Sequence, residues 1–391
     1  MRLESLRLPM HVVVLGAGYA GLTLTRLLEE DLPETVDITL VDRSPDHLVQ
    51  HELHRVIRRP ELAAAITVPL PEVLERAAVR VARVEEIDRD ERVVSLSTGA
   101  LSYDAAAICL GARTAYYGLE GVREHSTPLK RLSHANRIRS GALETFRGDD
   151  PRLVVGGAGL SGVQVAGELA ALAREERADA TITVLEQCEH VAPGFSDPFQ
   201  RAVRTALEEQ GVEVRTDAAV RRADETHVHL ESGDRVLYDR FVWTGGIRGA
   251  DALEGERPTV RSDLRLDDRT FALGDAVRAV GADGEPVPAS AQAAVREART
   301  VAESITTLAT DGDGIEVDAA LEAFTFESPG WVVSVGDDAV ATVGDRVLTG
   351  RAANGLKTTV GLGYLSAVSD AETAAGFAYR DLVPERFQRD R

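Results

Sequence analysis

Two glycine-rich motifs of the same form carry the first chemistry that this sequence suggests. Residues 16–21 read G-A-G-Y-A-G and residues 157–162 read G-A-G-L-S-G, and an apolar run precedes each, at 12–15 and at 153–155. A buried strand that ends in such a turn and leads into a helix presents backbone N–H groups to a dinucleotide pyrophosphate. Two such units predict two dinucleotides held face to face, a flavin and a nicotinamide, and therefore electron transfer.

An acidic residue follows each motif at a similar distance. The strand after the predicted helix 22–30 ends in Asp42, and the strand after the predicted helix 163–174 ends in Glu186. A carboxylate at this place accepts hydrogen bonds from ribose hydroxyls and repels a 2′-phosphate. Glu186 therefore favours NADH over NADPH, and the lack of an arginine directly after it in the sequence supports the same choice.

The two halves of the repeat also end in similar segments. Residues 97–112 and 231–246 each read as a hairpin with glycine in its turn, a Tyr-Asp pair, a buried strand and a glycine where the chain passes close to a cofactor. A further apolar strand that ends in Gly-Asp, F-A-L-G-D-A at 271–276, follows the second half. We expect this strand to return and complete the first half, so that the second half is inserted into the first.

The repeat predicts an α/β protein with two Rossmann-like dinucleotide-binding domains and a small C-terminal α+β domain. We expect residues 1–115 and 251–320 to form the FAD-binding domain, residues 116–250 the NADH-binding domain, and residues 321–391 the C-terminal domain. With 391 residues, 44% of them hydrophobic, the chain is long and apolar enough to bury the cores of such domains.

The chain is strongly acidic. Its formal net charge is -20, and lysine occurs only at Lys130 and Lys357. Such a surface repels nucleic-acid phosphates, so nucleic acid is not an expected partner. The composition suits a protein kept soluble in high salt, where screening weakens the repulsion between like charges, and therefore predicts a halophilic protein.

Signals for export, membrane insertion and metal binding are weak. No apolar signal core precedes the first strand, and no stretch of eighteen apolar residues occurs, so we expect a cytoplasmic location. His47, His51 and His54 are spaced loosely like metal ligands, but no other ligand cluster joins them in the sequence, and we predict no metal. Cys109 and Cys188 form no C-x-x-C pair, so we expect no redox-active disulfide.

These features resemble those of the two-dinucleotide-binding flavoproteins, which have a glutathione-reductase-like fold, and among them the type II NADH dehydrogenases, the single-subunit NADH:quinone oxidoreductases. Beyond the two motifs, five segments are similar to that family. They are H-L-V-Q-H-E-L-H-R-V at 47–56 with I-T-V-P-L-P-E-V-L at 66–74, V-L-E-Q-C-E-H-V-A-P-G-F at 184–195, V-W-T-G-G-I at 242–247, P-A-S-A-Q-A-A at 288–294, and L-T-G-R-A-A-N-G-L-K-T-T-V-G-L-G-Y-L at 348–365. The resemblance covers nearly the whole chain.

The resemblance implies roles for residues of this sequence. The implied FAD contacts are Gly16, Ala17, Gly18, Ala20, Gly21, Asp42, Arg43, Gly111, Ala112, Gly274, Asp275 and Gln292. The implied NADH contacts are Gly157, Gly159, Leu160, Ser161, Gly162, Glu186 and Gly245. In the transfer of hydride from NADH to FAD and of electrons to a quinone, the implied catalytic residues are Gln164, Gln292 and Lys357. The resemblance further implies peripheral association with the cytoplasmic face of the cell membrane through the C-terminal segment, and assembly as a homodimer.

One residue departs from the family pattern. The helix after the second motif usually reads G-V-E-x-A-G-E in that family, whereas residues 162–168 read G-V-Q-V-A-G-E. Gln164 thus replaces a glutamate near the nicotinamide and the quinone. Its amide can hydrogen-bond a carboxamide or a quinone oxygen but cannot titrate, which puts proton delivery by a carboxylate at this position in doubt.

Three other functions stay open at this point. A sulfide:quinone reductase shares the fold but needs cysteine sulfurs beside the flavin, and Cys109 and Cys188 do not resemble that arrangement. A soluble reductase would pass electrons to a ferredoxin or a rubredoxin. A redox-sensing module would bind FAD and NAD and scarcely turn over, an alternative that Gln164 keeps open.

Overall fold

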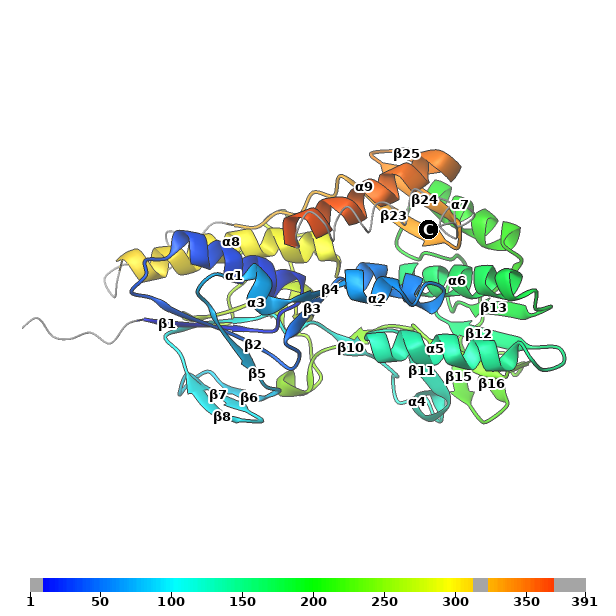
Figure 1. Ribbon diagram of the computed structural model, residues 1–391, viewed down its shortest axis with the longest axis horizontal. Helices are drawn as coiled ribbons and strands as arrows, with labels where there is room; N and C mark the ends of the chain where they lie inside the picture. The colour runs from blue at the N-terminus through cyan, green and yellow to red at the C-terminus, as the bar shows by residue number, and fades with distance from the viewer. Residues whose placement is uncertain (1–9, 312–322, 369–391) are drawn as a thin grey trace, which may run out of the picture. The chain divides into compact units, whose positions relative to one another are not determined.

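The computed structural model describes residues 10–311 and 323–368 (Figure 1). These residues form two compact units, each built from three separate stretches of chain. The first unit comprises the described residues of Met1–Leu48, Val68–Arg113 and Arg248–Glu327, and the second those of Val49–Thr67, Thr114–Ile247 and Ser328–Arg391. The last part of the expected C-terminal domain, residues 369–391, lies outside the described residues.

A five-stranded parallel sheet forms the centre of the first unit. The strand order is β21 (Thr270–Ala272), β9 (Ala105–Ile108), β1 (His11–Leu15), β2 (Asp37–Asp42) and β5 (Ala78–Val81). Residues 12–15 of the central strand are all fully buried. A parallel sheet is covered on both faces, which is why this strand is apolar throughout rather than alternating.

Helices and a small sheet cover the two faces of this parallel sheet. Helices α1 (Tyr19–Asp31) and α8 (Ala291–Asp311) pack against each other on one side. The antiparallel strands β6 (Val84–Asp88), β7 (Val93–Leu96) and β8 (Gly99–Ser102) lie on the other side (Figure 1). The buried face of α1 is Ala20, Gly21, Leu22, Leu24, Thr25 and Leu28, which recurs at helical spacing.

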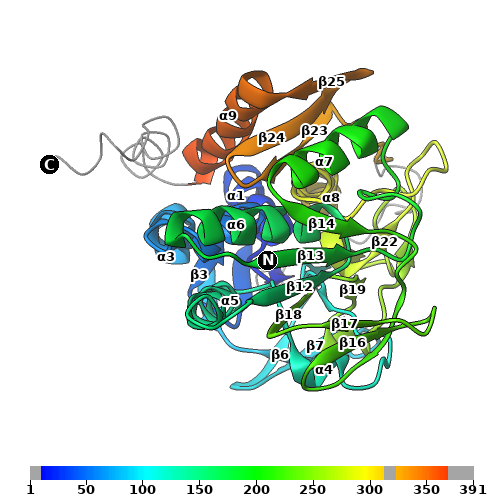
Figure 2. The same ribbon diagram turned by 90° about the vertical axis from the view of Figure 1, so that its right-hand side faces the viewer.

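The second unit repeats this plan. Its parallel sheet has the order β11 (Ser126–Pro128), β18 (Arg240–Trp243), β12 (Arg152–Gly156), β13 (Thr181–Leu185) and β14 (Val212–Arg215), and Figure 2 shows the last four stacked in this order. Helix α6 (Leu160–Glu176) packs on β12 and β13, α7 (Asp197–Glu209) on β14, and α5 (Leu132–Thr145) on β18 and β11. An antiparallel sheet of β15 (Val220–Ala223), β16 (His227–Leu230) and β17 (Arg235–Leu237) completes the repeat.

The two sheets differ in where their last strand comes from. In the second unit, β18 is flanked by β11, which precedes it in the chain. In the first unit, β9 is flanked by β21, which follows the whole of the second sheet in sequence. The strand that ends in Gly-Asp therefore returns to the first sheet. Both sheets have the Rossmann-like form that the fold class predicts, and the strands of the second sheet lie in the chain between β9 and β21.

Two further segments pack within the second unit. The 3-10 helix η1 (Gln50–Ile57) and helix α2 (Leu62–Ala65) precede most of the unit in sequence, and η1 contacts α5 and α6. An antiparallel sheet of β23 (Gly330–Val335), β24 (Asp338–Val343) and β25 (Arg346–Thr349) contacts α6 and α7. Helix α9 (Gly350–Val368) covers it, with Ala339, Ala341 and Ala353 buried between them.

The remaining elements are short. They are β3 (Asp46–Leu48), β4 (Thr67–Pro69), α3 (Leu70–Val73), β10 (Arg113–Thr114), α4 (Val122–His125), β19 (Ile247–Arg248), η2 (Asp251–Leu253), β20 (Thr259–Val260), η3 (Gly274–Ala276) and β22 (Arg278–Ala279). Across residues 10–311 and 323–368, no helix combines the length and the apolar character needed to cross a lipid bilayer.

Candidate dinucleotide-binding sites

The first glycine turn links β1 to α1, and the protein itself requires two of its three motif glycines. Gly16 has a φ of +106°, and a Cβ there would lie 2.3 Å from the carbonyl oxygen of Cys109. A Cβ at Gly21 would lie 1.7 Å from the carbonyl oxygen of Gly16. A Cβ at Gly18 would instead meet no other described residue within 4 Å. Protein packing therefore does not explain Gly18, whereas a pyrophosphate approaching the backbone at the start of a helix does.

The turn between β12 and α6 repeats this arrangement. Gly157 has a φ of +93°, and a Cβ there would lie 2.8 Å from the Cα of Gly245. A Cβ at Gly162 would lie 1.8 Å from the carbonyl oxygen of Gly157, and one at Gly159 would meet nothing within 4 Å in the described chain. Both units thus leave the same middle position open, and Gly245 lies against the second turn.

Asp42, at the end of β2, is fixed against the first turn. Its Oδ2 accepts a hydrogen bond from the backbone N–H of Ala17 at 2.8 Å, and its Oδ1 accepts one from that of Ser44 at 2.9 Å. The buried ring of His47 shares a hydrogen bond of 2.8 Å between its Nδ1 and the carbonyl oxygen of Ala17. Ala17 and Asp42 therefore lie together, and Arg43 is exposed beside them.

Glu186 has the same two contacts in the second unit. Its Oε2 accepts a hydrogen bond from the backbone N–H of Ala158 at 2.7 Å, and its Oε1 accepts one from that of Cys188 at 3.0 Å. The side chain is only 4% exposed, so these bonds hold it in one orientation. Each carboxylate oxygen has two lone pairs, so Asp42 and Glu186 can each still accept hydrogen bonds from a ligand.

The other residues implied as cofactor contacts lie at strand ends or in first helical turns. Ala20 lies in the first turn of α1, and Leu160 and Ser161 begin α6. Gly111 and Ala112 follow β9. Gly111 has a φ of +61°, and a Cβ there would meet no described residue within 4 Å. The carboxyl edge of the strands is where open α/β sheets bind their ligands.

The late Gly-Asp pair lies beside the first turn. Gly274 has a φ of +67°, and a Cβ there would lie 3.2 Å from the Cβ of Ala20. The backbone carbonyl of Asp275 accepts a hydrogen bond of 2.8 Å from Nε of Arg257. The carboxylate of Asp275 makes no hydrogen bond to any described residue. Strand β21 thus carries an acceptor to the glycine turn of β1.

Glu297 of α8, a residue outside the predicted set, supports this pair. Its Oε2 accepts a hydrogen bond of 2.5 Å from the backbone N–H of Gly274, and its side chain is 2% exposed. Burial raises the pKa of Glu297 to about 7, although the hydrogen bond from Gly274 opposes the shift. A sequence signal was present, because one charged residue interrupts an apolar stripe at helical spacing. The buried stripe is Ala293, Glu297, Val301 and Ile305.

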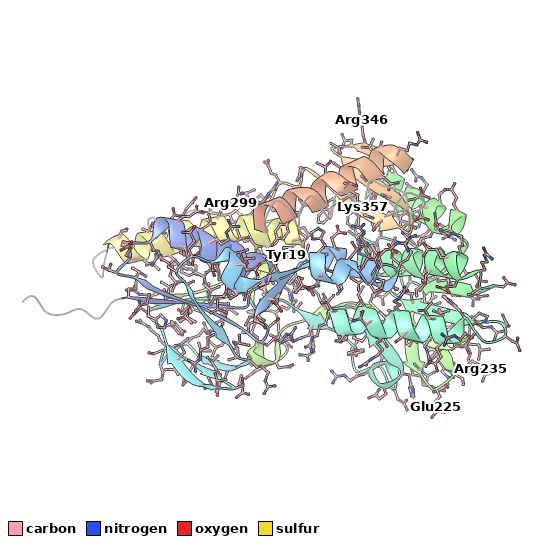
Figure 3. All side chains as sticks on the ribbon, in the orientation of Figure 1. Tyr19, Glu225, Arg235, Arg299, Arg346 and Lys357 are labelled. Atoms are coloured by element: carbon pink, nitrogen blue, oxygen red, sulfur yellow. The ribbon has the colours of Figure 1, made fainter. Side chains whose placement is uncertain are left out.

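The predicted catalytic residues fall in different units. Gln292 lies at the start of α8 in the first unit, whereas Gln164 on α6 and Lys357 on α9 belong to the second unit. Gln164 is half-buried, and its amide makes no hydrogen bond to another residue in the described ranges. Figure 3 marks Lys357 on α9.

A buried carboxylate on η1, Glu52, lies close to Lys357. Its Oε2 is 3.0 Å from Nη1 of Arg55, and its Oε1 is 3.5 Å from Nε2 of His51. Burial raises the pKa of Glu52, but the charges of Arg55, His51 and Lys357 outweigh this effect and lower the pKa to about 2. The neighbouring His54 hydrogen-bonds the Oγ of Ser334 at 2.7 Å. Glu52 is therefore an ionised carboxylate whose charge interacts with that of Lys357, and the sequence alone did not indicate it.

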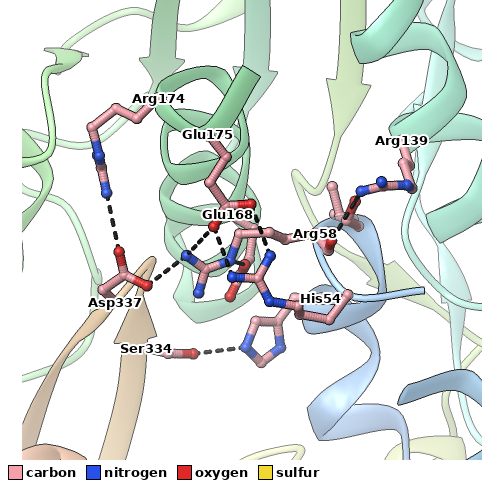
Figure 4. Close-up of polar contacts among 10 residues, drawn as sticks. His54, Arg58, Arg139, Glu168, Arg174, Glu175, Ser334 and Asp337 are labelled. Carbon is pink, nitrogen blue, oxygen red and sulfur yellow. Dashed lines mark hydrogen bonds and ion pairs between the residues drawn. The ribbon is translucent and has the colours of Figure 1, made fainter. Parts of the chain in front are cut away.

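Arg58, directly after η1, joins α6 to the turn between β23 and β24 (Figure 4). Its Nε lies 2.9 Å from Oε2 of Glu168, and its Nη1 lies 2.5 Å from Oδ1 of Asp337. Burial raises the pKa of Glu168, and the positive charge of Arg58 opposes this shift. The backbones also meet closely here, because a Cβ at Gly167 would lie 2.4 Å from the backbone nitrogen of Gly336.

Several relatives of known name cover nearly the whole chain. A type II NADH:quinone oxidoreductase from Staphylococcus aureus (strain MSSA476) is 27% identical over 382 residues, which cover 89% of this chain and 93% of the relative. A protein of the same name from Staphylococcus haemolyticus (strain JCSC1435) is 26% identical over the same length and shares.

Solved structures share the fold. NDH2 from Plasmodium falciparum in complex with NADH has a TM-score of 0.83 at 13% identity, covering 97% of this chain and 98% of that one. The sulfide:quinone oxidoreductase from Aquifex aeolicus has a TM-score of 0.79 at 19% identity, covering 92% and 91%. These likenesses confirm the predicted fold class. The model of the pyridine nucleotide-disulphide oxidoreductase family matches residues 10–298, so the chain belongs to that family.

Proposed function

We propose that this protein is an FAD-dependent oxidoreductase that takes hydride from NADH and passes electrons to a quinone, as a type II NADH:quinone oxidoreductase. The observation that carries the proposal is the repeated glycine turn. Both turns leave only the middle glycine unexplained by the protein, at Gly18 and at Gly159. The names of the relatives from the two Staphylococcus species point to the same reaction.

The first unit fits FAD. Gly18 leaves room for the pyrophosphate, and Asp42 accepts hydrogen bonds from the adenosine ribose. Asp275 presents a carboxylate without a described hydrogen-bond partner, which suits the hydroxyls of the ribityl chain. Gly111 leaves the edge beyond β9 open. When bound, FAD supplies the redox chemistry, and the residues of the unit hold and orient it.

The second unit fits NADH. Gly159 leaves room for the pyrophosphate at the N-terminus of α6, and Glu186 accepts from the adenosine ribose. A 2′-phosphate would meet the buried carboxylate of Glu186, so NADPH should bind more weakly than NADH. We accordingly propose residues 1–115 with 251–320 as the FAD-binding domain and residues 116–250 as the NADH-binding domain.

Gln164, Gln292 and Lys357 are proposed to serve the transfer of electrons to the acceptor. NADH, a proton and a quinone give NAD⁺ and a quinol, so negative charge develops on the quinone oxygens. The ammonium group of Lys357, whose charge interacts with that of Glu52, would stabilise the charge on the quinone oxygens. Gln164 can donate to an oxygen but cannot supply the proton.

The partners of the protein follow from this reaction. We propose NADH and a quinone as its small-molecule substrates. We further propose peripheral association with the cytoplasmic face of the cell membrane through the C-terminal segment, and a homodimer. A preparation that sediments with quinone-containing vesicles, and runs at twice the chain mass by light scattering, would support both.

The described cysteines do not suit a sulfide:quinone reductase. Cys109 is buried, and its pKa is raised by burial and by the nearby charge of Glu297. Cys188 is exposed, but its pKa is also raised, by partial desolvation and by Glu186. Because the thiolate is the reactive form of cysteine, neither Cys109 nor Cys188 is activated for sulfur chemistry at neutral pH.

Stopped-flow spectroscopy tests the proposed function directly. The purified protein should be yellow, and anaerobic NADH should bleach its flavin absorbance faster than NADPH does. A soluble quinone should then restore the absorbance at high salt. Absence of flavin from the folded protein, or no bleaching by NADH, would overturn the proposal. Restoration by a ferredoxin but not by a quinone would favour the soluble reductase instead, and bleaching without turnover the redox-sensing module.

A further inference from the structure

Glu297 occupies an unusual place for a carboxyl group. It belongs to the buried stripe of α8 and receives the backbone N–H of Gly274 at 2.5 Å. Its other neighbours on α8, one helical turn away on either side, are the apolar residues Ala293 and Val301. A buried carboxylate is strongly disfavoured unless charge or several hydrogen bonds compensate it.

The charges around Glu297 compensate it only in part. From η3, Asp275 adds a second negative charge, and Arg257, ahead of β20, adds a positive one. From the end of β9, the Cys109 thiol lies within reach of its charge. The buried positions of α1, the other helix packed against α8, carry no titratable side chain. These influences leave the pKa of Glu297 at about 7, so both of its protonation states are populated near neutrality.

Glu297 also lies close to the first glycine turn. Gly274, to which it is hydrogen-bonded, packs against Ala20 of the motif. The charge of Glu297 helps to raise the pKa of Cys109, and Cys109 packs against both Gly16 and Gly21. An anion held by that turn would therefore act on Glu297 through a largely buried and weakly screening medium.

We propose that Glu297 couples the binding of FAD to the uptake of a proton. The pyrophosphate of FAD adds two negative charges near the carboxylate of Glu297, which burial already destabilises. These charges favour the neutral, protonated form of Glu297. By linkage, FAD binds more tightly where Glu297 is protonated and less tightly where it is ionised. The inference rests on the proposed function only in taking FAD as the ligand of the first unit.

The second unit provides an internal control. It repeats the sheet, the glycine turn and the ribose acid, but the helix that corresponds to α8 is α5, and its buried residues are Ala135, Ile138 and Ala142. Strand β11, the counterpart of β21, leads into Lys130 rather than an aspartate. Binding of NADH should therefore take up no proton through an equivalent group.

The experiment is calorimetric titration of FAD into the deflavinated full-length protein at pH 7, in buffers of different ionisation enthalpy, together with FAD affinity from pH 6 to pH 8. The wild type should take up protons and lose about tenfold in affinity over this range. Glu297→Gln keeps an acceptor for the backbone N–H of Gly274 but cannot titrate. This variant should therefore take up no protons when FAD binds, and its FAD affinity should vary less than about twofold over the same pH range. NADH titration of the deflavinated wild type, in which no flavin can accept hydride, is the control.

Two outcomes would overturn the proposal: no proton uptake by the wild type, or the same pH dependence in Glu297→Gln. If Glu297→Gln does not fold, as judged by thermal unfolding of the apoprotein at pH 6, Asp275→Asn replaces it. The negative charge of Asp275 raises the pKa of Glu297, so its removal should let Glu297 ionise more readily and shift the midpoint of the pH dependence downward. An unchanged midpoint or an upward shift would overturn the proposal. Failure of FAD to bind at any pH would instead contradict the proposed function.

Discussion

Arg58 and Glu168 form a buried ion pair, with Nε and Oε2 2.9 Å apart and side chains only 11% and 2% exposed. Neither atom has a hydrogen-bond partner of suitable geometry among the described residues. Arg58 and Glu168 therefore attract each other mainly through their opposite charges. Arg58 also reaches Glu175 and Asp337, which ties η1 to α6 and to the turn between β23 and β24. Figure 4 shows these groups converging on the guanidinium.

Replacing Arg58 should therefore weaken the second unit severely. Arg58→Ala leaves Glu168 buried without its counter-charge, and we expect a loss of about 3 kcal/mol or more in the free energy of unfolding. Denaturant unfolding at high salt measures it. Arg204→Ala, which breaks an exposed pair with Glu208, is the control and should change stability by less than about 0.5 kcal/mol. Equal effects of the two substitutions would contradict the role given to Arg58.

Substitutions at two glycines of the first turn should distinguish an effect on FAD binding from an effect on folding. Gly18→Ala adds a methyl group that meets no described residue, so the protein should fold normally and lose about tenfold or more in FAD affinity. Gly21→Ala places the methyl group 1.7 Å from the carbonyl oxygen of Gly16 and should impair folding itself. Flavin absorbance per folded protein, with the melting temperature, distinguishes the two. Normal FAD content in Gly18→Ala would argue against the assigned cradle.

Glu186 should set the choice of nicotinamide cofactor. Glu186→Ala removes the ribose acceptor, so we expect the dissociation constant for NADH to rise by about tenfold. The preference for NADH over NADPH should shrink, because the 2′-phosphate no longer meets a carboxylate. Equilibrium binding to the deflavinated protein, in which no flavin oxidises the nucleotide, measures both constants. The exposed Glu189 supplies the matched control, Glu189→Ala, which should leave both unchanged; an identical response of the two variants would remove Glu186 from the site.

His54 should make the second unit sensitive to acid. Burial, aided by the charge of Lys357, lowers the pKa of His54 to about 3, whereas the unfolded chain titrates near 6.5. The unfolded state therefore binds more protons between these values, and stability falls as the pH drops below 6.5. Between pH 6.5 and pH 5, the wild type should lose about 2 kcal/mol more than His54→Gln.

Denaturant midpoints at the two pH values test this expectation. Glutamine retains a polar contact with Ser334 but does not titrate, which isolates the charge. His190 is exposed, so His190→Gln should follow the wild type. If His54→Gln also follows the wild type, His54 is not the group responsible.

Local patterns in the sequence predict the parts of the site that depend on backbone conformation. The turns at Gly16 and Gly157 are such parts, because a positive φ and a close backbone approach leave only glycine. Asp42 and Glu186 follow from their place at the end of the second strand. Their hydrogen bonds to Ala17 and Ala158 repeat because the local chain geometry repeats.

Long-range pairings could not be read in the same way. Glu168 stands in a motif of its own helix, but its partner Arg58 comes from a segment over a hundred residues earlier. The proximity of Lys357 to Glu52 likewise depends on how α9 packs within the second unit. Glu297 was visible as a charge in an apolar stripe, yet the Gly274 backbone that explains it lies on another element. Such contacts are set by tertiary packing, which periodicity does not encode.

The return of β21 to the first sheet has a consequence for synthesis on the ribosome. The strands of the second sheet, β11 to β18, emerge as one continuous run, whereas β9 lacks its neighbour until Thr270–Ala272 has been made. The second sheet can therefore assemble while the first still shows an open parallel edge. An unpaired edge of this kind invites wrong partners. Pausing or truncation of translation between residues 243 and 270 should thus yield a nascent chain that needs chaperone protection at β9.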